Sequence, residues 1–337
     1  MNYWQIGSGE NRREYSEEFL RYGMAFVGGR NECARMEKDV SVGDRVLLKK
    51  GTSKVLAFGT VVERDGKYKG NGDKDWLRDF DGWDLPAYCF VDWHEVPGDG
   101  KPANGLSRGA IKRIDMQELK NLAEEGLVTY PPVKSYHPEP GKTREVTDKE
   151  LTDFVSQKGL DATHAASLSA NLGEISRIGS FYRNEYPNWA YIKEHETRTF
   201  LIVPLLAALA WEPEQIKIEL HLGKRVGVAD IACFSHAFTG GKNERQDCVL
   251  LIEAKGMSQG LQRVEKDQLK RYTDCLPKCK VAFTSNGICY KAFVRGDHGQ
   301  FSFETPSAYL NILNRRDKYP LDPKVGGCKE TLELLMP

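Results

Sequence analysis

The sequence RVGVADIACF (residues 225–234), followed after a polar loop by CVLLIEAKG (residues 248–256), determines the fold of the second half of this 337-residue chain. Both apolar runs are short and rich in Val, Ile and Phe, so they predict two buried strands joined by a turn-forming loop. Asp230 interrupts the first run. Glu253 and Lys255 are two residues apart and therefore face the same side of the second strand. Because a charge in a buried strand is costly unless it is paired or binds a metal, these side chains mark a candidate site.

Two carboxylates and an amine on one face of a sheet form a candidate site for a divalent cation, with the amine beside a metal-bound water. The same residues have simpler explanations. A single Asp in a strand is more often a turn or edge residue, and Glu and Lys two apart on a strand usually form a solvated salt bridge. The pattern alone therefore leaves both a metal site and a structural ion pair open.

The order of these residues resembles the PD-(D/E)XK nuclease superfamily, and most closely the N-terminal nuclease domains of type I restriction enzyme motor subunits. That family has an acidic helix, a short strand ending in Asp, a strand with Glu-x-Lys, and a helix with Gln-x-x-x-Tyr. Ala229 stands where the superfamily has Pro before the Asp. The resemblance covers residues 192–294, under a third of the chain. Its elements are the helix-like segment 194–211, Asp230, Glu253-Ala254-Lys255, Gln268 with Tyr272, and the segment 281–287.

The resemblance implies a restriction-endonuclease-like mixed sheet flanked by helices, and a Mg²⁺ site at which Mn²⁺ is a second candidate ion. Asp230 and Glu253 would bind the ion, with the Ala254 carbonyl as a third ligand. Lys255 would orient or help deprotonate the attacking water and stabilise charge in the transition state. Gln268 is the fourth residue of this expected catalytic set.

Further residues around the site follow from the same resemblance. Tyr272 is four residues after Gln268, hence on the same helix face, where the pair could orient the site or touch the DNA backbone. Lys270 and Arg271 on this helix are expected nucleic-acid contacts. A helical glutamate often completes such sites, and Glu194 and Glu196 both qualify as metal ligands. Glu219, just before the Asp strand, is a further candidate.

Residues 1–115 contain many short apolar runs separated by glycine turns, a pattern that predicts a small β-barrel. Three stretches resemble the PUA-like group, which includes the EVE, ASCH and YTH domains: WQIG (4–7), GDRV (43–46) and VDW (91–93). In that group the barrel often holds a modified or flipped base in an aromatic pocket. The resemblance therefore implies a recognition module over residues 1–115.

Tryptophans are concentrated in this module. Aromatic faces can stack on an extruded base while polar groups read its edge. The same side chains can instead form the core of the barrel or contact a partner protein, and the sequence leaves these alternatives open. Two of the tryptophans, Trp76 and Trp83, fall in the polar stretch 70–84, a predicted loop, where a ligand contact is more readily made. The four tryptophans are Trp4, Trp76, Trp83 and Trp93.

The remaining sequence predicts a helical connector and then the nuclease domain. The connector, residues 116–185, contains a proline-rich linker (130–141) and a capping box formed by Thr147 and Glu150. The nuclease domain is expected over residues 186–337, with a final helix over 307–315.

Composition limits the classes of function. Lys plus Arg equals Asp plus Glu at 48 each, which argues against a broadly basic nucleic-acid coat but not against a local groove. Eight cysteines without a C-x-x-C pair predict reduced thiols rather than a zinc site. The N-terminal residues lack a signal-peptide pattern, and the longest apolar run, 200–211, is too short to span a bilayer. We therefore expect a cytoplasmic protein without a membrane partner.

The leading functional hypothesis is a Mg²⁺-dependent endonuclease for double-stranded DNA whose N-terminal module selects the target, with a modified base as one candidate. This combination resembles prokaryotic restriction or other anti-phage defence. One active site per chain suggests a homodimer on DNA, and a partner subunit of a defence system is a further candidate. The alternatives are a non-catalytic nucleic-acid reader or partner-binding protein, and an effector nuclease activated by a nucleotide signal; a repair nuclease and an RNA substrate also stay open.

Overall fold

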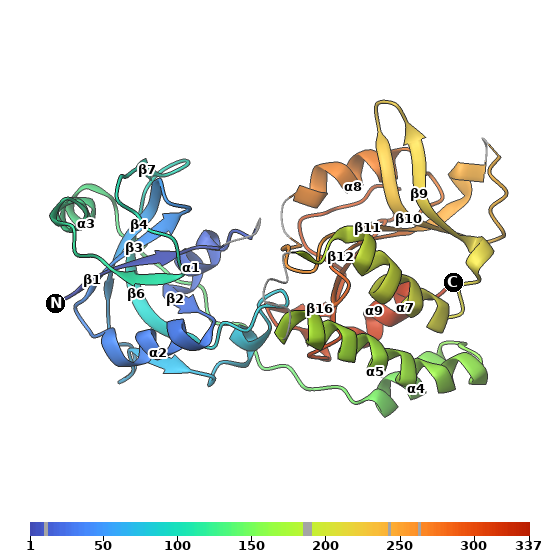
Figure 1. The fold of residues 1–337 in the computed structure, drawn as a ribbon, viewed down its shortest axis with the longest axis horizontal. Helices are drawn as coiled ribbons and strands as arrows, with labels where there is room; N and C mark the ends of the chain where they lie inside the picture. The colour runs from blue at the N-terminus through green and yellow to red at the C-terminus, as the bar shows by residue number, and fades with distance from the viewer. Residues whose placement is uncertain (10–12, 185–190, 242–243, 262–263) are drawn as a thin grey trace. The chain divides into compact units, whose positions relative to one another are not determined.

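A computed structural model gives the fold of residues 1–9, 13–184, 191–241, 244–261 and 264–337. It divides the chain into two compact units, Met1–Gly141 and Lys142–Pro337 (Figure 1). Both units are mixed α/β structures.

The first unit is built on one mixed sheet. Its strands are β1 (Tyr3–Gly7), β2 (Met24–Val27), β3 (Arg45–Lys50), β4 (Lys54–Val61), β5 (Lys69–Asn71), β6 (Ala87–Glu95), β7 (Lys101–Pro102) and β8 (Ile111–Arg113). Its helices are α1 (Ser16–Tyr22), α2 (Arg30–Asp39), α3 (Gln117–Thr129) and a 3₁₀ helix at Asp75–Asp79.

The sheet of the first unit forms a half-barrel. The strand order is β2-β6-β4-β3-β1-β8, with β5 on β6 and β7 on β4. Among the strand pairs of the described residues in this unit, β1 and β3 are parallel and the others are antiparallel. β2 and β8 stand at the two ends of this strand order. In the described residues these two strands do not pair with each other, so the predicted barrel is not closed. Helix α2 packs against both of these end strands, which explains how the open side is covered.

The structure divides the predicted connector 116–185 between the two units, after Gly141. Helix α3 belongs to the first unit: Leu119 and Ala123 are buried in one core cluster with Leu47 and Phe58 of the sheet. An amphipathic helix is stabilised by burying its apolar face, and the nearest apolar surface is the sheet just before it in the chain.

The second unit has an eight-stranded sheet. Its strands are β9 (Ile216–Gly223), β10 (Gly227–Phe234), β11 (Cys248–Ala254), β12 (Val281–Ser285), β13 (Cys289–Val294), β14 (Ala308–Asn311), β15 (Lys318–Tyr319) and β16 (Asp322–Gly326). Its helices are α4 (Asp148–Gln157), α5 (Ala162–Asn184), α6 (Glu194–Thr197), α7 (Val203–Ala208), α8 (Val264–Asp274) and α9 (Cys328–Leu335). A π-helical segment, Arg198–Ile202, connects α6 to α7, and 3₁₀ turns lie at Pro213–Gln215 and Glu244–Asp247.

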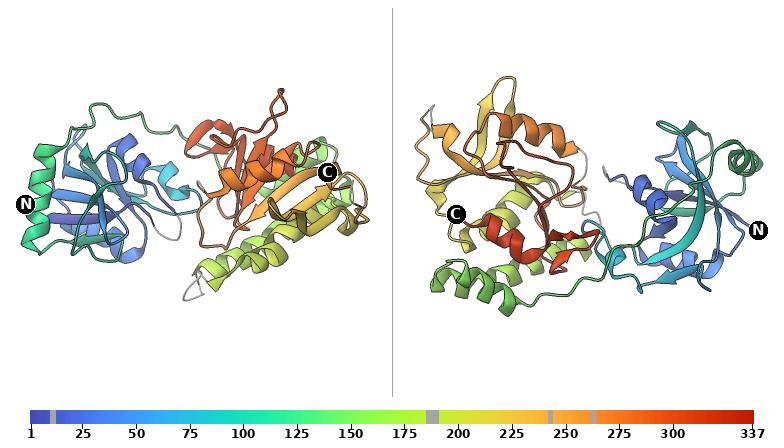
Figure 2. Two further views of the ribbon diagram at one scale, coloured as in Figure 1. Left: turned by 90° about the horizontal axis from the view of Figure 1, so that it is seen from above. Right: turned by 180° about the vertical axis from the view of Figure 1, so that it is seen from behind.

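Helices cover both faces of this sheet (Figures 1 and 2). The strand order is β15-β16-β14-β13-β12-β11-β10-β9, with β11 parallel to β12 and β14 parallel to β16. One core cluster joins the sheet to α4, α5, α7 and α9, and another joins it to α8. Alternate strand residues enter the two clusters: Ile231 and Cys233 the first, Ala232 and Phe234 the second.

Local predictions in the second unit have mixed outcomes. The Thr147–Glu150 capping box is confirmed at the start of α4. The helix predicted over 307–315 is wrong, because Ala308–Asn311 is strand β14, paired with β13. All four residues of β14 are buried, so its apolar pattern carries no period that would separate a buried strand from a helix. In the part of the chain that the structure describes, no helix is long and apolar enough to cross a membrane.

Candidate functional site

Strands β10 and β11 bring the two predicted carboxylates together. They pair antiparallel with Ile231 opposite Ile252, which places Asp230 beside the end of β11. The backbone N–H of Ala254 donates to Oδ2 of Asp230 at 2.9 Å. The predicted pairing of the two strands is confirmed, and the hydrogen bond fixes the Asp230 carboxylate next to the Glu-x-Lys segment.

Glu253 and Lys255 form a buried ion pair. Their exposed fractions are 3% and 5%, and Nζ of Lys255 lies 2.6 Å from Oε1 of Glu253. The same Oε1 accepts a hydrogen bond from Nε2 of Gln268 at 2.6 Å. The predicted alternative of a solvated salt bridge is therefore wrong, because both side chains are withdrawn from water.

The second oxygen of Glu253, Oε2, is buried without a hydrogen-bond partner among the described residues. An unsatisfied buried carboxylate oxygen costs roughly 1–3 kcal/mol or more, so such atoms are uncommon in folded proteins. An oxygen of this kind beside a second carboxylate fits a cation.

The electrostatics at Glu253 also favour a bound cation. Burial, followed by repulsion from Asp230, raises the pKa of Glu253 to about 7, although Lys255 opposes the rise and Glu194 adds to it. The positive charge of Lys255 therefore does not offset burial and the negative charge of Asp230. A bound divalent cation would favour the ionised form of Glu253.

The structure distinguishes the two helical glutamates that the sequence left open. Oε2 of Glu196 accepts the backbone N–H of Lys193 at 2.7 Å and so caps the start of α6. Glu194 is close enough to Glu253 to raise the pKa of its carboxyl group. Of the two, Glu194 is therefore the better candidate to complete the site.

Arg198 is a site residue to which sequence reasoning gave no role. Its guanidinium pairs with Oδ1 of Asp230 at 3.2 Å and with Oε1 of Glu219 at 3.2 Å. Arg198 follows Glu194 by four residues, hence on the same helix face. That spacing was the available signal, but the pairing with Asp230, 32 positions away, is visible only in the fold.

Helix α8 supplies a hydrogen-bonded pair, Gln268 and Tyr272, next to Glu253. Tyr272 is only 3% exposed; its hydroxyl accepts from Nε2 of Gln268 at 2.9 Å and donates to the Val228 carbonyl at 2.8 Å. Of its two predicted roles, the structure favours orientation of the site. Lys270 and Arg271 are exposed and bonded locally, to Asp274 and to the Asp267 carbonyl, so they do not converge on it.

The donor set fits Mg²⁺ better than a protein-rich metal cage. In the described residues, no group of three or more His, Cys, Asp or Glu side chains could hold a metal by itself. Mg²⁺ is usually bound by one or two carboxylates and keeps several waters, so it does not need such a group. Asp230 and Glu253, with the Ala254 carbonyl, would provide the protein ligands.

The four tryptophans of the first unit do not form one aromatic cage. Trp93 is fully buried, and its Nε1 donates to the Met24 carbonyl. Trp76 is 3% exposed, lies in the 3₁₀ helix rather than the predicted loop, and contacts the rings of Phe26 and Phe80. For these two, base binding is therefore wrong and the core alternative is favoured.

The other two tryptophans lie elsewhere. Trp83 is half-buried, with the Arg13 guanidinium 4.3 Å from its ring centroid. Trp4 is 2% exposed and lines a pocket. Trp4 therefore presents no open ring face of the kind that base stacking needs.

Comparisons with known proteins add no family to this description: no family model matches the chain, and no curated protein matches it.

Proposed function

We propose that the protein is a metal-dependent endonuclease of the PD-(D/E)XK type, acting on double-stranded DNA in prokaryotic restriction or another anti-phage defence. The observation that carries the proposal is the buried Glu253–Lys255 pair beside Asp230 with one carboxylate oxygen of Glu253 unsatisfied. A structural ion pair would be expected to satisfy both oxygens, because an unpaired one destabilises the fold.

Two further features support this proposal. The mixed sheet has helices on both faces (Figure 1). Its antiparallel pair β10–β11 carries Asp230 and Glu253 next to each other. Gln268 and Tyr272 then connect the site to helix α8. A restriction-endonuclease-like arrangement of this sheet is part of the proposal.

Each residue has a distinct task in this proposal. When bound, Mg²⁺ supplies Lewis-acid stabilisation of charge on the scissile phosphate. Asp230 and Glu253 would hold the ion, and the hydrogen bond from Gln268 restrains rotation of the Glu253 carboxylate. Lys255 keeps its ammonium group beside Glu253, where it can position the attacking water and stabilise developing negative charge.

The first unit selects the target in this scheme, and cutting of both strands requires two chains on the DNA because each chain has one such site. The cellular location that fits this activity is the cytoplasm.

Cleavage of supercoiled plasmid in the presence of Mg²⁺ tests the proposal. Wild type should nick or linearise the plasmid, and Asp230→Ala and Lys255→Ala should lower the rate by at least about a hundredfold. Lys149→Ala is the matched control, since Lys149 is an exposed lysine on α4 that forms an ion pair with Asp153. Phage DNA with modified bases, compared with unmodified DNA of the same sequence, tests target selection.

Two results would overturn the proposal. If wild type binds DNA but cuts no substrate with either Mg²⁺ or Mn²⁺, the protein is a reader instead. If cleavage survives unchanged in both site variants, the chemistry does not reside at Asp230 and Lys255.

A further inference from the structure

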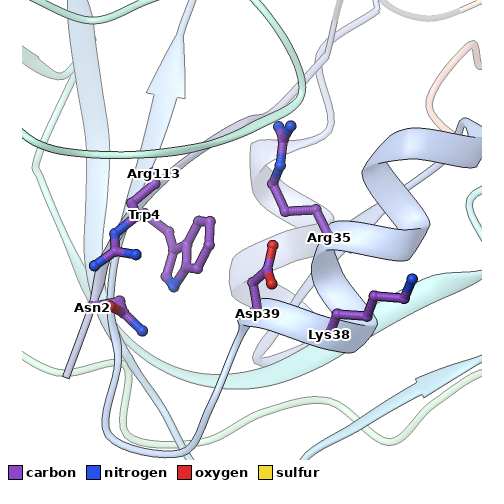
Figure 3. Close-up of a pocket in the computed structure, with 6 residues that line it drawn as sticks. All are labelled: Asn2, Trp4, Arg35, Lys38, Asp39 and Arg113. Carbon is purple, nitrogen blue, oxygen red and sulfur yellow. The ribbon is translucent and has the colours of Figure 1, made fainter.

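A pocket of about 410 Å³ lies in the first unit, apart from the residues of the proposed metal site (Figure 3). Its size is within the range of small-ligand sites. The strand β1, the second half of α2 and the strand β8 surround it. The lining residues are Asn2, Trp4, Arg35, Lys38, Asp39 and Arg113.

Strand register and helix period explain why these side chains meet. Trp4 lies directly opposite Arg113 in the antiparallel β1–β8 pair, and opposite residues of such a pair face the same side of the sheet. On α2, Arg35 is followed by Lys38 three residues later and by Asp39 four residues later, so they share one helix face. Figure 3 shows Trp4 between Arg113 on one side and the α2 residues on the other.

Trp4 forms a rigid wall of this pocket. Its Nε1 donates to Oδ2 of Asp44 at 2.9 Å, and Asp44 also accepts the backbone N–H groups of Asn2 and Ser41. With 2% of its surface exposed, the indole does not offer a ring face to a base. Recognition in this pocket therefore depends on the polar side chains.

These side chains carry an excess of positive charge. Arg35 is anchored through a hydrogen bond from Nη1 to the Ile111 carbonyl at 2.7 Å. In the described part of the chain, Lys38 and Arg113 form no ion pair with an acid. Three cations and one carboxylate, Asp39, thus line one concave site, and such a site attracts anions.

We propose that this pocket binds a nucleotide phosphate. Arg35 and Arg113 each present a planar guanidinium that suits phosphate oxygens, and Lys38 adds a point charge. Their charged ends point in different directions (Figure 3), so each contacts phosphate oxygens separately. Asp39 and Asn2 supply hydrogen-bonding groups for the sugar or base edge, which inorganic phosphate lacks. The phosphate belongs either to a nucleic-acid backbone or to a free mononucleotide, and both present this chemistry.

The test uses the full chain carrying Asp230→Ala, in EDTA, so that the binding result is independent of cleavage. Fluorescence anisotropy would follow a short fluorescein-labelled oligothymidylate, with thymidine 5′-monophosphate and inorganic phosphate as competitors. Arg113→Ala and Lys38→Ala should each weaken binding by about tenfold and lower the slope of log affinity against log salt by about one. Arg35 is left intact because it also holds the Ile111 carbonyl.

Lys112→Ala is the matched control. Lys112 is exposed and adjacent to Arg113, but successive strand residues face opposite sides, so it points away from the pocket face. The control should change affinity by less than about twofold, against the tenfold expected for a phosphate contact. Preferential binding of the oligonucleotide assigns a backbone phosphate, and equal competition by the mononucleotide assigns a free nucleotide. Two outcomes would overturn the proposal. In the first, Arg113→Ala, Lys38→Ala and Lys112→Ala change affinity equally while their melting temperatures stay unchanged. In the second, no probe binds.

Discussion

The guanidinium of Arg198 lies 3.2 Å from Oδ1 of Asp230, the carboxylate that we propose as a metal ligand. Oδ2 of Asp230 is already held by the backbone N–H of Ala254. Both oxygens therefore have a donor, and a cation that uses Oδ1 must share it with Arg198 or displace it. Glu219, exposed on the other side of Arg198, offers the guanidinium an alternative partner. Arg198 thus controls how much negative charge Asp230 presents to a metal.

Replacing Arg198 with Ala should tighten metal binding. The change removes a positive charge beside Asp230, and with it both competition for Oδ1 and repulsion of the ion. We expect the Mg²⁺ dissociation constant to fall by about tenfold, or about 1.4 kcal/mol, in calorimetric titrations. Glu219→Gln is the control, because it leaves the Arg198–Asp230 pair in place. Weaker metal binding in Arg198→Ala would show instead that Arg198 is needed to hold Asp230 in position.

The pKa of Glu253 predicts a pH-dependent stability in the absence of metal. Its pKa is raised to about 7 in the folded protein, whereas an unfolded Glu titrates near 4.3. The protonated form is therefore favoured by folding, and this contribution is complete below about pH 4 and lost as pH rises through about 7. The Glu253→Gln variant cannot lose this stability contribution, because the glutamine side chain does not ionise.

The measurement is the difference in unfolding free energy between Glu253→Gln and wild type, from denaturant titrations in EDTA. Between about pH 5 and pH 8 this difference should shift in favour of the variant by on the order of 3 kcal/mol. Its absolute sign at a given pH also depends on the Lys255 contact, so the slope is the informative quantity. A difference that stays constant with pH would contradict the raised pKa of Glu253.

Tyr272→Phe should separate orientation of the site from metal binding. The variant loses the hydroxyl that connects Gln268 to the Val228 carbonyl, while Gln268 keeps its bond to Glu253. We expect metal affinity to stay within about twofold and kcat to fall by roughly tenfold with little change in KM, as is typical when positioning is disturbed. A rise in KM for DNA with kcat unchanged would indicate a direct DNA contact by Tyr272 instead.

The strand pair of the second unit could be predicted because its signals are local. Short β-branched runs, and a Glu and a Lys two residues apart, report a strand and its charged face without reference to the rest of the fold. The roles of Arg198 and Tyr272 could not be predicted in the same way. Their partners, Asp230 and the Val228 carbonyl, belong to β10 and are brought near only by packing of the helices on the sheet.

The roles of the aromatic residues of the first unit could not be assigned from the sequence for a different reason. Composition indicates that Trp76 and Trp93 have a role, but a buried aromatic and a ligand-stacking one have the same residue type and similar neighbours in sequence. The deciding quantity is exposure of the ring, which depends on distant contacts such as that of Trp76 with Phe26. The pocket beside Trp4 could likewise not be predicted from the sequence, because its lining residues Arg35 and Arg113 are far apart in the chain.

Helix α3 provides a test of the first unit's boundary through a pair of glycine substitutions. A Cβ added at Gly126 would lie 2.4 Å from the ring of Phe58, whereas one added at Gly173 of α5 would meet nothing within 4 Å. Gly→Ala within a helix otherwise stabilises by about 1 kcal/mol. Gly173→Ala should therefore raise the melting temperature of the second unit, and Gly126→Ala should destabilise the first by about 1–3 kcal/mol through overpacking.

Differential scanning calorimetry of the full chain measures both variants under the same conditions. The first unit holds Phe58 and α3 in one core cluster, so a loss at Gly126 reports that α3 is docked there. If α3 were instead part of a separate connector, its glycine would behave like an exposed helical one, and both substitutions would stabilise equally. A lower transition temperature for Gly126→Ala alone would place the end of the first unit after α3, because only a helix packed on the sheet can bring Gly126 against Phe58.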